Sequence, residues 1–573
     1  NQEIQKHNLM TENNYDAIIV GTGVSGGWAA KELCEKGLKT LVLERGPMVK
    51  HIEDYPTMND DHWDYPAGDI ITQEIRKRQP KQSRTGYVNS ESTKHFFVDD
   101  NKHPYNEKKP FNWIRGYHVG GRSLLWGRQV YRLSDFDFEA NIKDGVAVDW
   151  PIRYKDLAPW YQYVEEYIGV SGEYLGLPHL PDSKFLKAME LHCVEEELKK
   201  SLKEKYDDRL LTIGRVAHIT EGTKPGLGRV SCQFRNRCRR GCPYGSYFSS
   251  NSSTLPAAES SGNMTLRPNS IVSEVIYDEN KKCATGVRII DSESNETIEY
   301  SAKVIFLCAS TVASTSILMQ SKSDRFPNGM GNDSNELGHN LMDHHFQVGA
   351  SGKHDDFKDK YYTGRRPNGI YIPRFRNLGG NTDQKNFIRG YGYQGGGRRR
   401  GWSPNIKELA YGAKFKEAIL KPGEWGMNLG AFGEILPYHD NKLILDYDKT
   451  DKWGLPTVTF DAELKENELN MRKDMQQQAI EMLENAGFND VKGNDRTYNF
   501  GNGIHEMGTA RMGNDPKTSV LNKNNQLHSV PNVYVTDGSA MTSAGCTNPS
   551  LTYMALTARA ANHAVEELKK MNI

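Results

Sequence analysis

The chain has 573 residues, with 73 lysines and arginines against 73 aspartates and glutamates. This length exceeds one ordinary core and predicts two domains or one large composite domain. The balanced charge argues against nucleic acid or an anionic membrane as the main partner. No apolar run approaches the roughly 18 residues of a membrane span. The longest runs, AIIVG near residue 17 and VIFLCA near residue 304, indicate buried strands.

The first fourteen residues are polar and contain no hydrophobic core of a signal peptide. Three explanations stay open: there was never a signal, the signal was removed, or a partner carries the chain across a membrane. Eight cysteines do not make a disulfide scaffold in a chain of this length. Five of them are scattered among apolar or small residues and are expected to be buried free thiols: Cys34, Cys193, Cys283, Cys308 and Cys546.

A strand–helix–strand pattern of the kind that binds dinucleotides runs from residue 15 to 46. An apolar stretch with β-branched residues predicts a buried strand, and a G-x-G-x-x-G turn follows it. The next stretch predicts a helix that Gly37 ends and that buries one face, with Trp28, Ala29, Leu33 and Cys34. The segment KTLVLE predicts the second strand, which closes on Glu44.

Each part of this pattern has a physical role in holding a pyrophosphate. Gly21 permits a tight turn, Gly23 lets the backbone approach the phosphates, and Gly26 lets helix and strand pack closely. The helix N-terminus supplies unpaired N–H groups and a partial positive charge. Glu44 can accept hydrogen bonds from ribose hydroxyls. The pattern indicates a dinucleotide but does not separate NAD from FAD.

Five further motifs follow along the chain. They are GYHVGGRSLLWGRQVYRLSDFDF from residue 116, VIFLCASTVASTSIL from 304, LGHNLMDHHF from 337, HEMGTARMG from 505 and NVYVTDGSAMTSAGCTNPSLTYMALTARAANH from 532. In this order and at these spacings the chain resembles the glucose–methanol–choline (GMC) oxidoreductases, from about residue 15 to 565. It looks most like their bacterial sugar-oxidising branch, which includes flavin subunits of glucose, gluconate and glycoside 3-dehydrogenases, and pyranose oxidases.

The resemblance implies FAD as the cofactor and an α/β fold. A Rossmann-like FAD-binding domain would carry an inserted α+β substrate domain built on an antiparallel sheet. The FAD-binding domain would be discontinuous and would include the cysteine-rich segment 231–245, with its parts at 12–50, 112–345 and 500–573. The substrate-binding or cap domain would comprise 51–111 and 346–499. There the glycine-rich, polar stretch GGNTDQKNFIRGYGYQGGGRRRGW suits a loop over a pocket.

The resemblance also implies which residues carry the chemistry. Oxidising an alcohol needs a base for the hydroxyl proton, and histidine suits because its pKa lies near neutrality. The resemblance places this base at His505, the first residue of HEMGTARMG. It places the partner at Asn548, where many relatives carry histidine, and the amide would orient the substrate hydroxyl. Structural roles are expected for the other histidines of the family motifs, His118, His344 and His345.

FAD is expected to bind without a covalent bond. Some pyranose oxidases attach flavin to a histidine in a GGxSxHW stretch, but this chain has GGRSLLW, with Leu125 at that place. A leucine cannot form the bond. The pyrophosphate site and the later flavin motifs would hold the cofactor, through Gly21, Gly23, Gly26, Glu44, Gly121, Ser123, Asp537 and Gly538.

Three further cysteines, Cys232, Cys238 and Cys242, lie in SCQFRNRCRRGCPYG. Flavin subunits of certain bacterial sugar dehydrogenases carry a similar triad, which holds a three-iron, four-sulfur (3Fe-4S) cluster. Thiolates ligate such clusters, and a proline after the last cysteine is found in ferredoxins. The intervening arginines would favour thiolate over thiol. The alternatives are a disulfide with one thiol left over, a zinc site completed by His218, or a solvated basic face.

These observations lead to one hypothesis and three alternatives. The hypothesis is an FAD-dependent dehydrogenase that oxidises a secondary hydroxyl of a sugar or glycoside, with carbon 3 of glucosides first, by proton abstraction and hydride transfer to flavin. Electrons would pass through the cluster to a cytochrome c or quinone. A small export-carrying subunit could accompany the chain, and the periplasm is favoured over the cytoplasm. The alternatives are an oxygen-using pyranose oxidase, a redox-silent lyase that keeps FAD as structure, and an electron-transfer scaffold.

Overall fold

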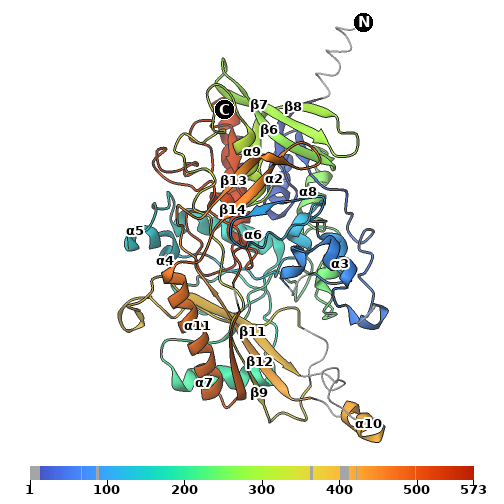
Figure 1. Cartoon of the computed structure of the whole chain (residues 1–573), viewed down its shortest axis with the longest axis vertical. Coiled ribbons are helices and arrows are strands. Elements are labelled where there is room, and N and C mark those ends of the chain that lie inside the picture. Colours follow the sequence, from blue (N-terminus) through green and yellow to red (C-terminus); the bar gives the residue numbers. More distant parts are fainter. Residues whose placement is uncertain are drawn as a thin grey trace.

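The structure is a computed structural model and describes residues 13–65, 68–85, 89–361, 366–399, 412–420, 423–496 and 498–573. Within these residues the strands form sheets of seven, six and three strands. The seven-stranded and six-stranded sheets lie toward opposite ends of the molecule, and the C-terminus lies with the seven-stranded sheet (Figure 1).

The seven-stranded sheet has a parallel part and an antiparallel part. Its order is β5 (Met264–Arg267), β2 (Thr40–Leu43), β1 (Asn14–Val20), β8 (Thr297–Leu307), β7 (Cys283–Asp291) and β6 (Ser270–Asp278), and β16 (Val533–Val535) also pairs with β8. The pairs β5–β2, β2–β1, β1–β8 and β8–β16 are parallel. The pairs β8–β7 and β7–β6 are antiparallel. Parallel strands covered on both faces read as unbroken apolar runs, as AIIV and TLVL do.

The predicted strand–helix–strand pattern is confirmed as β1, α2 (Val24–Glu35) and β2. Gly37 follows the helix with a φ of 87°, a conformation that favours glycine. Close packing of helix on strand depends on Gly26, because a Cβ there would lie 1.9 Å from the carbonyl oxygen of Gly21. The helix is buried on more than the one predicted face, since α8 (Thr254–Ser260) and α12 (Ser550–Lys569) also pack on it.

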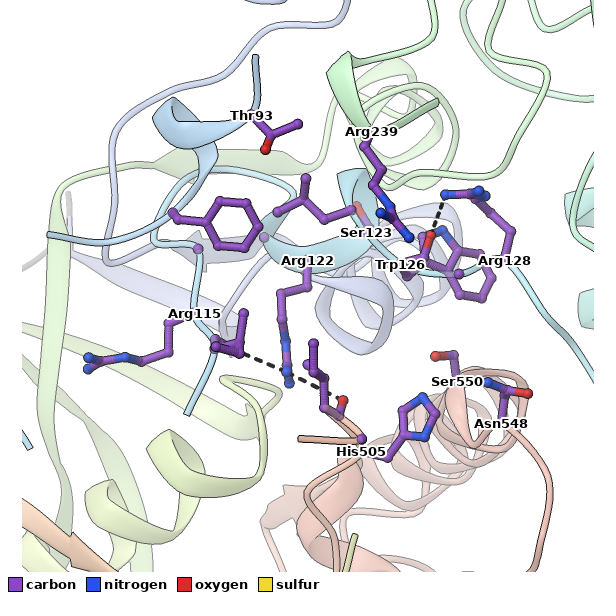
Figure 2. A pocket seen from close by; sticks show the side chains of 18 of the residues that line it. Thr93, Arg115, Arg122, Ser123, Trp126, Arg128, Arg239, His505, Asn548 and Ser550 are labelled. Atoms are coloured by element: carbon purple, nitrogen blue, oxygen red, sulfur yellow. Dashed lines mark hydrogen bonds between the residues drawn. The ribbon is translucent and has the colours of Figure 1, made fainter. Parts of the chain in front are cut away.

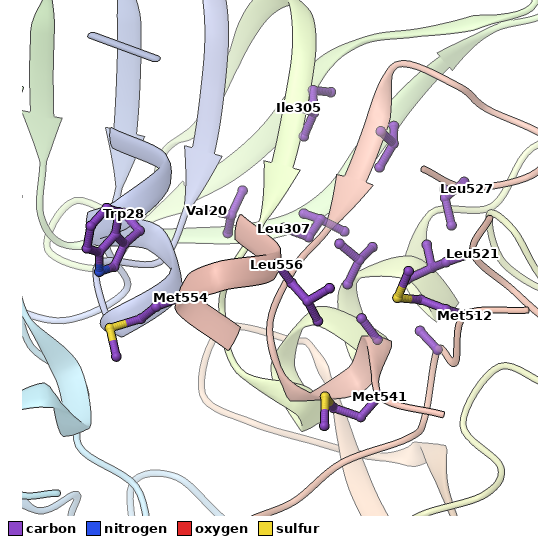
Figure 3. Packing of buried hydrophobic residues seen from close by; sticks show 14 of the residues in the cluster. Val20, Trp28, Ile305, Leu307, Met512, Leu521, Leu527, Met541, Met554 and Leu556 are labelled. Carbon is purple, nitrogen blue, oxygen red and sulfur yellow. The ribbon is translucent and has the colours of Figure 1, made fainter. Parts of the chain in front are cut away.

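The seven-stranded sheet and the helices packed on it form one lobe of the molecule, and a hydrophobic core lies between them. Side chains from β1, β8, α2 and α12 meet there, among them Val20, Leu307, Trp28 and Leu556 (Figure 3). The helix α6 (Tyr154–Ile168) packs on α12, and α9 (Thr311–Gln320) packs on β6. These side chains are buried, and their close packing holds the ends of β1 and β2 in place.

The six-stranded sheet is antiparallel throughout. Its order is β15 (Asn489–Asp495), β9 (Val348–His354), β12 (Trp425–Gly433), β11 (Tyr391–Arg399), β10 (Ile370–Ile372) and β4 (Thr212–Ile213). One face packs on α11 (Glu466–Asn485) and α7 (Cys193–Lys205). Alternation along β12 buries Met427, Leu429 and Ala431 and leaves Asn428 and Gly430 on the other face.

One expectation was wrong for this sheet. The glycine-rich stretch predicted to be a loop contains β11, which pairs with β12 along its whole length and with β10 over three residues, 393–395. Its glycines were mistaken for turn residues, whereas they leave a flat sheet face, and Tyr391 and Tyr393 anchor the strand in the core. The last three residues of the stretch, 400–402, lie outside the described residues.

The three-stranded sheet joins β13 (Lys442–Thr450), β14 (Pro456–Asp461) and β3 (Asn106–Glu107). The described residues also form four short α-helices: α3 (Gln73–Arg78), α4 (Asp135–Phe138), α5 (Ala140–Asp144) and α10 (Ala413–Leu420). The helix α7 and strand β4 belong to the layer of the six-stranded sheet, although the sequence groups them with 112–345. The division into a FAD-binding and a substrate domain stays a prediction. Across the described residues, no helix combines the length and apolar character that crossing a membrane requires.

Candidate active site

A cavity of about 1950 Å³ lies between the two large sheets. Its wall includes the turns that follow β1 and β2, and residues of β9, β11 and β12, among them Ser351, Gln394 and Asn428. Pockets for drug-sized ligands measure about 300–1,000 Å³. The cavity therefore has room for a dinucleotide together with a second molecule.

Most of the predicted site residues meet in this one cavity. The wall contains all of the predicted catalytic residues and most of the predicted cofactor residues: His505, Asn548, Gly21, Gly23, Glu44, Gly121, Ser123, Asp537 and Gly538. Gly26 is not part of the wall, which agrees with a packing role. Of the three clustered cysteines, only Cys238 reaches the wall.

The turn between β1 and α2 forms a cradle for phosphate. Gly23 is the N-cap of α2 and brings no side-chain hydrogen bond, so the first N–H groups of the helix remain available to a ligand. A Cβ on Gly23 would meet nothing within 4 Å, so open space faces the backbone there. Gly121 approaches this turn closely, since its Cβ would lie 3.7 Å from the Cα of Gly23.

Glu44 lies at the end of β2, where a ribose acceptor is predicted. Its Oε2 accepts a hydrogen bond from Thr22 Oγ1 at 2.5 Å, and its Oε1 accepts one from the Gly46 N–H at 3.0 Å. Burial raises the pKa of Glu44 to about 7. Each carboxylate oxygen has a second lone pair, so Glu44 can also accept from a ligand hydroxyl.

Polar groups also surround the other predicted cofactor residues. Ser123 donates to the Gly120 carbonyl at 2.6 Å, and Asp537 accepts from Ser314 Oγ at 2.5 Å and from the Ser539 N–H at 3.0 Å. The Tyr553 hydroxyl, in the same wall, is buried without a partner among the described residues. Buried hydroxyls are rarely left unsatisfied, so this group fits a bound polar molecule. Tyr553 was missed from the sequence, because its motif gave no signal of an orphaned hydroxyl.

His505 is held at its ring and at its backbone by two adjacent residues of the LGHNLMDHHF motif. The Nδ1 atoms of His344 and His505 lie 2.9 Å apart. The Asp343 carboxylate accepts a hydrogen bond from the His505 N–H at 3.0 Å and another from the Gly503 N–H at 3.0 Å. A structural role was expected for His344, and its contact with the His505 ring is compatible with a positioning role of that kind.

These contacts determine which nitrogen of His505 carries the proton. The Nε2 of His344 lies 2.8 Å from the Gly545 carbonyl oxygen, which only accepts, so this nitrogen bears the hydrogen. Burial lowers the pKa of His344 to about 4, so the ring is neutral near pH 7 and its Nδ1 accepts. His505 therefore donates from Nδ1 and keeps an unprotonated Nε2. That nitrogen has a lone pair available for a proton.

His505 and Asn548 lie on the same side of the pocket, with Ser550 beside Asn548 and with Arg122 and Ser123 on other parts of the wall (Figure 2). Arg122, in the middle of the view, forms an ion pair with Glu506 at 3.0 Å. Glu506 is the neighbour of His505 in the chain, so the pair ties the His505 segment to the GGRS motif. Neither charged residue was singled out from the sequence.

The three clustered cysteines are not placed to hold a metal ion. In the described residues, no group of three or more histidine, cysteine, aspartate or glutamate side chains is placed to hold a metal ion. All three are free thiols, so no disulfide joins any two of them. His218, the candidate fourth zinc ligand, accepts from Arg128 Nε through its Nε2 at 3.1 Å.

Three of the arginines near these cysteines make contacts away from the thiols. Arg235, Arg237 and Arg240 contact carbonyls and carboxylates of residues 58–69 instead. Burial raises the pKa of Cys232 to about 11 and also raises the pKa of Cys238. The charge of Arg239 lowers the pKa of Cys238, which is the expected direction, but desolvation outweighs it and the pKa is raised overall.

Comparison with known proteins agrees with this arrangement. The family models described as GMC oxidoreductase match residues 228–346 and 437–557. The 2-methyl-1,2-propanediol dehydrogenase of Mycolicibacterium austroafricanum is 27% identical over 96% of this chain and 94% of its own length. The fructose dehydrogenase large subunit of Gluconobacter japonicus is 24% identical over 97% and 98%. A formate oxidase of Aspergillus oryzae has the same fold, with a TM-score of 0.61, 14% identity, and coverage of 98% and 99%.

The parallel sheet with its phosphate cradle, facing an antiparallel sheet across one cavity, defines a dinucleotide-dependent enzyme. The chain carries the N- and C-terminal domains described by the GMC oxidoreductase family models. It is an oxidoreductase that acts on CH–OH groups, and the predicted α/β fold class is confirmed. Flavoenzymes of this family bind FAD, and the open cradle at Gly23 together with the orphaned Tyr553 hydroxyl fits such a cofactor.

Proposed function

We propose that the chain is an FAD-dependent dehydrogenase that oxidises a secondary hydroxyl of a sugar or glycoside, with carbon 3 of glucosides as the first candidate. The observation that carries the proposal is His505, whose Nδ1 is engaged by His344 while its side chain lines the cavity. A base with one nitrogen tied down and the other unprotonated is ready to take a hydroxyl proton. Bound FAD would supply the acceptor for the hydride of the carbinol carbon.

The face of the six-stranded sheet that lines the cavity carries polar groups that suit a substrate with several hydroxyls. Gln394, Asn428 and Ser351 offer amide and hydroxyl groups there, and Gly396 and Gly430 keep the surface between them flat. A sugar needs several hydrogen-bond partners at fixed places, together with room for its ring. Two of the relatives reported above are named for the oxidation of a diol, 2-methyl-1,2-propanediol, and of a sugar, fructose.

The residues of the chain would act on the hydroxyl in a simple sequence. Asn548 would hold the hydroxyl oxygen and orient the C–H bond, and His505 would take the proton at Nε2. The ion pair of Arg122 and Glu506 would keep the His505 segment in place. Non-covalent binding of FAD stays part of the proposal, since Leu125 in the cavity wall offers no nucleophile.

The test is anaerobic mixing of the FAD-loaded protein with methyl glucoside and with a panel of other sugars, followed by the flavin absorbance. Bleaching would support the proposal, and analysis of the product would identify the carbon oxidised. Reoxidation by a dye or cytochrome c without hydrogen peroxide would support a dehydrogenase. Rapid peroxide formation in air would favour an oxidase. A flavin that no sugar or simple alcohol bleaches would contradict the proposal.

The pH dependence of kcat/KM is expected to reflect a weakly basic His505. Burial, the nearby His344 and the charge of Arg122 lower the pKa of His505 well below its usual 6.5. The base must be unprotonated to act. As the pH is lowered through 6.5, kcat/KM should therefore stay constant, and it should fall only at the lower pH that matches the lowered pKa of His505. An acid limb centred at 6.5 or above would contradict this.

The same shift affects stability, so the profile needs a control for folding. An unfolded chain binds the histidine proton below its usual pKa, whereas the folded chain does not, and stability therefore decreases as the pH falls through that value. Circular dichroism and FAD content, measured at each pH, separate loss of the fold from protonation of the base.

The 3Fe-4S cluster, and an electron path through it, stay predictions from resemblance. Because no metal-binding group occurs among the described residues, we derive no step through a cluster. If the cluster exists, protein purified without air should contain stoichiometric iron, and its oxidised form should give an electron paramagnetic resonance signal. Iron-free protein would contradict the prediction and leave Cys232, Cys238 and Cys242 as ordinary thiols.

The partners and location also belong to the proposal. The relative from Gluconobacter japonicus is, by its name, the large subunit of fructose dehydrogenase. This name supports a search for a small, export-carrying subunit beside this chain. An acceptor such as cytochrome c or a quinone and a periplasmic location would follow from such a complex. Co-purification of a tagged chain and fractionation of the cells would test both.

A further inference from the structure

Gln394 is the polar side chain of the six-stranded sheet that reaches the predicted catalytic pair. It lies on β11, directly opposite Tyr371 of β10 and Gly430 of β12. Its neighbour Tyr393 points into the core on the side of α11. Because successive side chains of a strand point to opposite faces of the sheet, Gln394 points into the cavity. A Cβ on Gly430 would meet only the Gln394 carbonyl oxygen, at 3.6 Å, so open space remains beside the side chain.

The side chain of Gln394 holds one end of the Asn548 amide. Gln394 Nε2 donates a hydrogen bond to Asn548 Oδ1 at 2.5 Å, across 154 positions of the sequence. A carboxamide has one acceptor oxygen and one donor nitrogen. With Oδ1 engaged, the free end of Asn548 is its Nδ2 group, which makes no hydrogen bond of its own within the described chain.

The orientation of this amide matters for the proposed chemistry. When a base removes the hydroxyl proton, negative charge develops on the oxygen, and a fixed donor stabilises it more in the transition state than in the ground state. The Nδ2 group is such a donor. A reversed amide would present Oδ1 to the same oxygen and repel the developing charge.

We propose that Gln394 is a positioning residue that fixes the Asn548 amide with its N–H groups toward the substrate hydroxyl. This inference rests on the proposed function, because it assumes that Asn548 faces the oxygen that loses its proton. In this proposal the six-stranded sheet, which carries Gln394, does more than line the pocket. The sheet sets the hydrogen-bonding direction of a side chain that comes from the other lobe.

The experiment is a double-mutant cycle read by the rate of anaerobic flavin reduction with the substrate found above. The variants are Gln394→Met, Asn548→Ala and the two combined. Gln394→Met removes the donor at similar length and should lower the limiting rate roughly 10- to 100-fold, with a smaller change in apparent affinity. In the Asn548→Ala background, the same change should have almost no further effect, because Gln394 acts through Asn548.

A second variant and a control make the result specific. Gln394→Glu leaves only acceptors, which favours the reversed amide, so its limiting rate should be lower still. Gln477→Met, at an exposed position of α11 behind the same sheet, should leave the rate unchanged. FAD content and circular dichroism show whether each variant is folded.

Four outcomes would overturn the inference. They are additive losses in the cycle, a loss confined to substrate affinity, a wild-type rate in Gln394→Met, and Gln394→Glu matching the wild type. Failure of the proposed function gives a different result, because then no sugar reduces the wild-type flavin, and the inference falls with it. If Gln394→Met does not fold, Gln394→Glu alone, compared in both Asn548 backgrounds, decides.

Discussion

Replacing His505 by alanine is expected to lower the rate of flavin reduction by about 10²- to 10⁴-fold, the usual contribution of a general base. The Nε2 of His505 is the basic nitrogen that the His344 contact leaves unprotonated, and the cavity wall gives it access to a substrate. Stopped-flow absorbance of the flavin under saturating sugar measures the effect. FAD content should stay near the wild-type value, because the phosphate cradle lies on another part of the wall.

Two further measurements separate a base from a merely structural histidine. Added imidazole should restore part of the lost rate, since a small base can enter the space that the side chain leaves. His439→Ala, at an exposed position outside the cavity wall, should behave as the wild type. If His505→Ala kept more than a tenth of the wild-type rate, another residue would have to be the base.

The second large effect is expected at two glycines of the β1–α2 turn, which should respond differently to the same substitution. A Cβ on Gly26 would lie 1.9 Å from the Gly21 carbonyl oxygen, so α2 must move away from β1. Gly26→Ala should cost about 1–3 kcal/mol or more in unfolding free energy and should lose FAD. Thermal unfolding of the cofactor-free protein and its FAD content measure both effects.

Gly23→Ala provides the matched comparison. The position has a φ of −65°, which alanine adopts readily, and a Cβ would meet nothing within 4 Å. The cofactor-free protein should therefore be as stable as the wild type, while FAD binds more weakly because the methyl group occupies space meant for the pyrophosphate. Equal destabilisation of the two cofactor-free variants, or full FAD content in Gly23→Ala, would contradict this assignment.

The sequence alone determined the local parts of this protein. The β1–α2–β2 unit, the turn at Gly21 and Gly23, and Glu44 at the strand end follow from hydrophobic period and glycine spacing over some thirty residues. His505 and Asn548 came from resemblance to a family, and no pattern in their own surroundings would have selected them. The glycine-rich stretch around β11 misled, because pairing with distant strands outweighed its local turn character.

The tertiary structure decided how these residues are tuned. The His344–His505 contact joins positions 161 apart and sets which nitrogen is basic. The Gln394–Asn548 contact joins positions 154 apart on different lobes. The tightly spaced cysteines, by contrast, are not placed to hold a metal ion in the described part of the chain. The spacing of residues along a chain predicts their arrangement only within one helix, strand or turn. The protonated nitrogen of a histidine, the direction of an amide and the meeting of metal ligands depend on atoms that folding brings from distant parts of the chain.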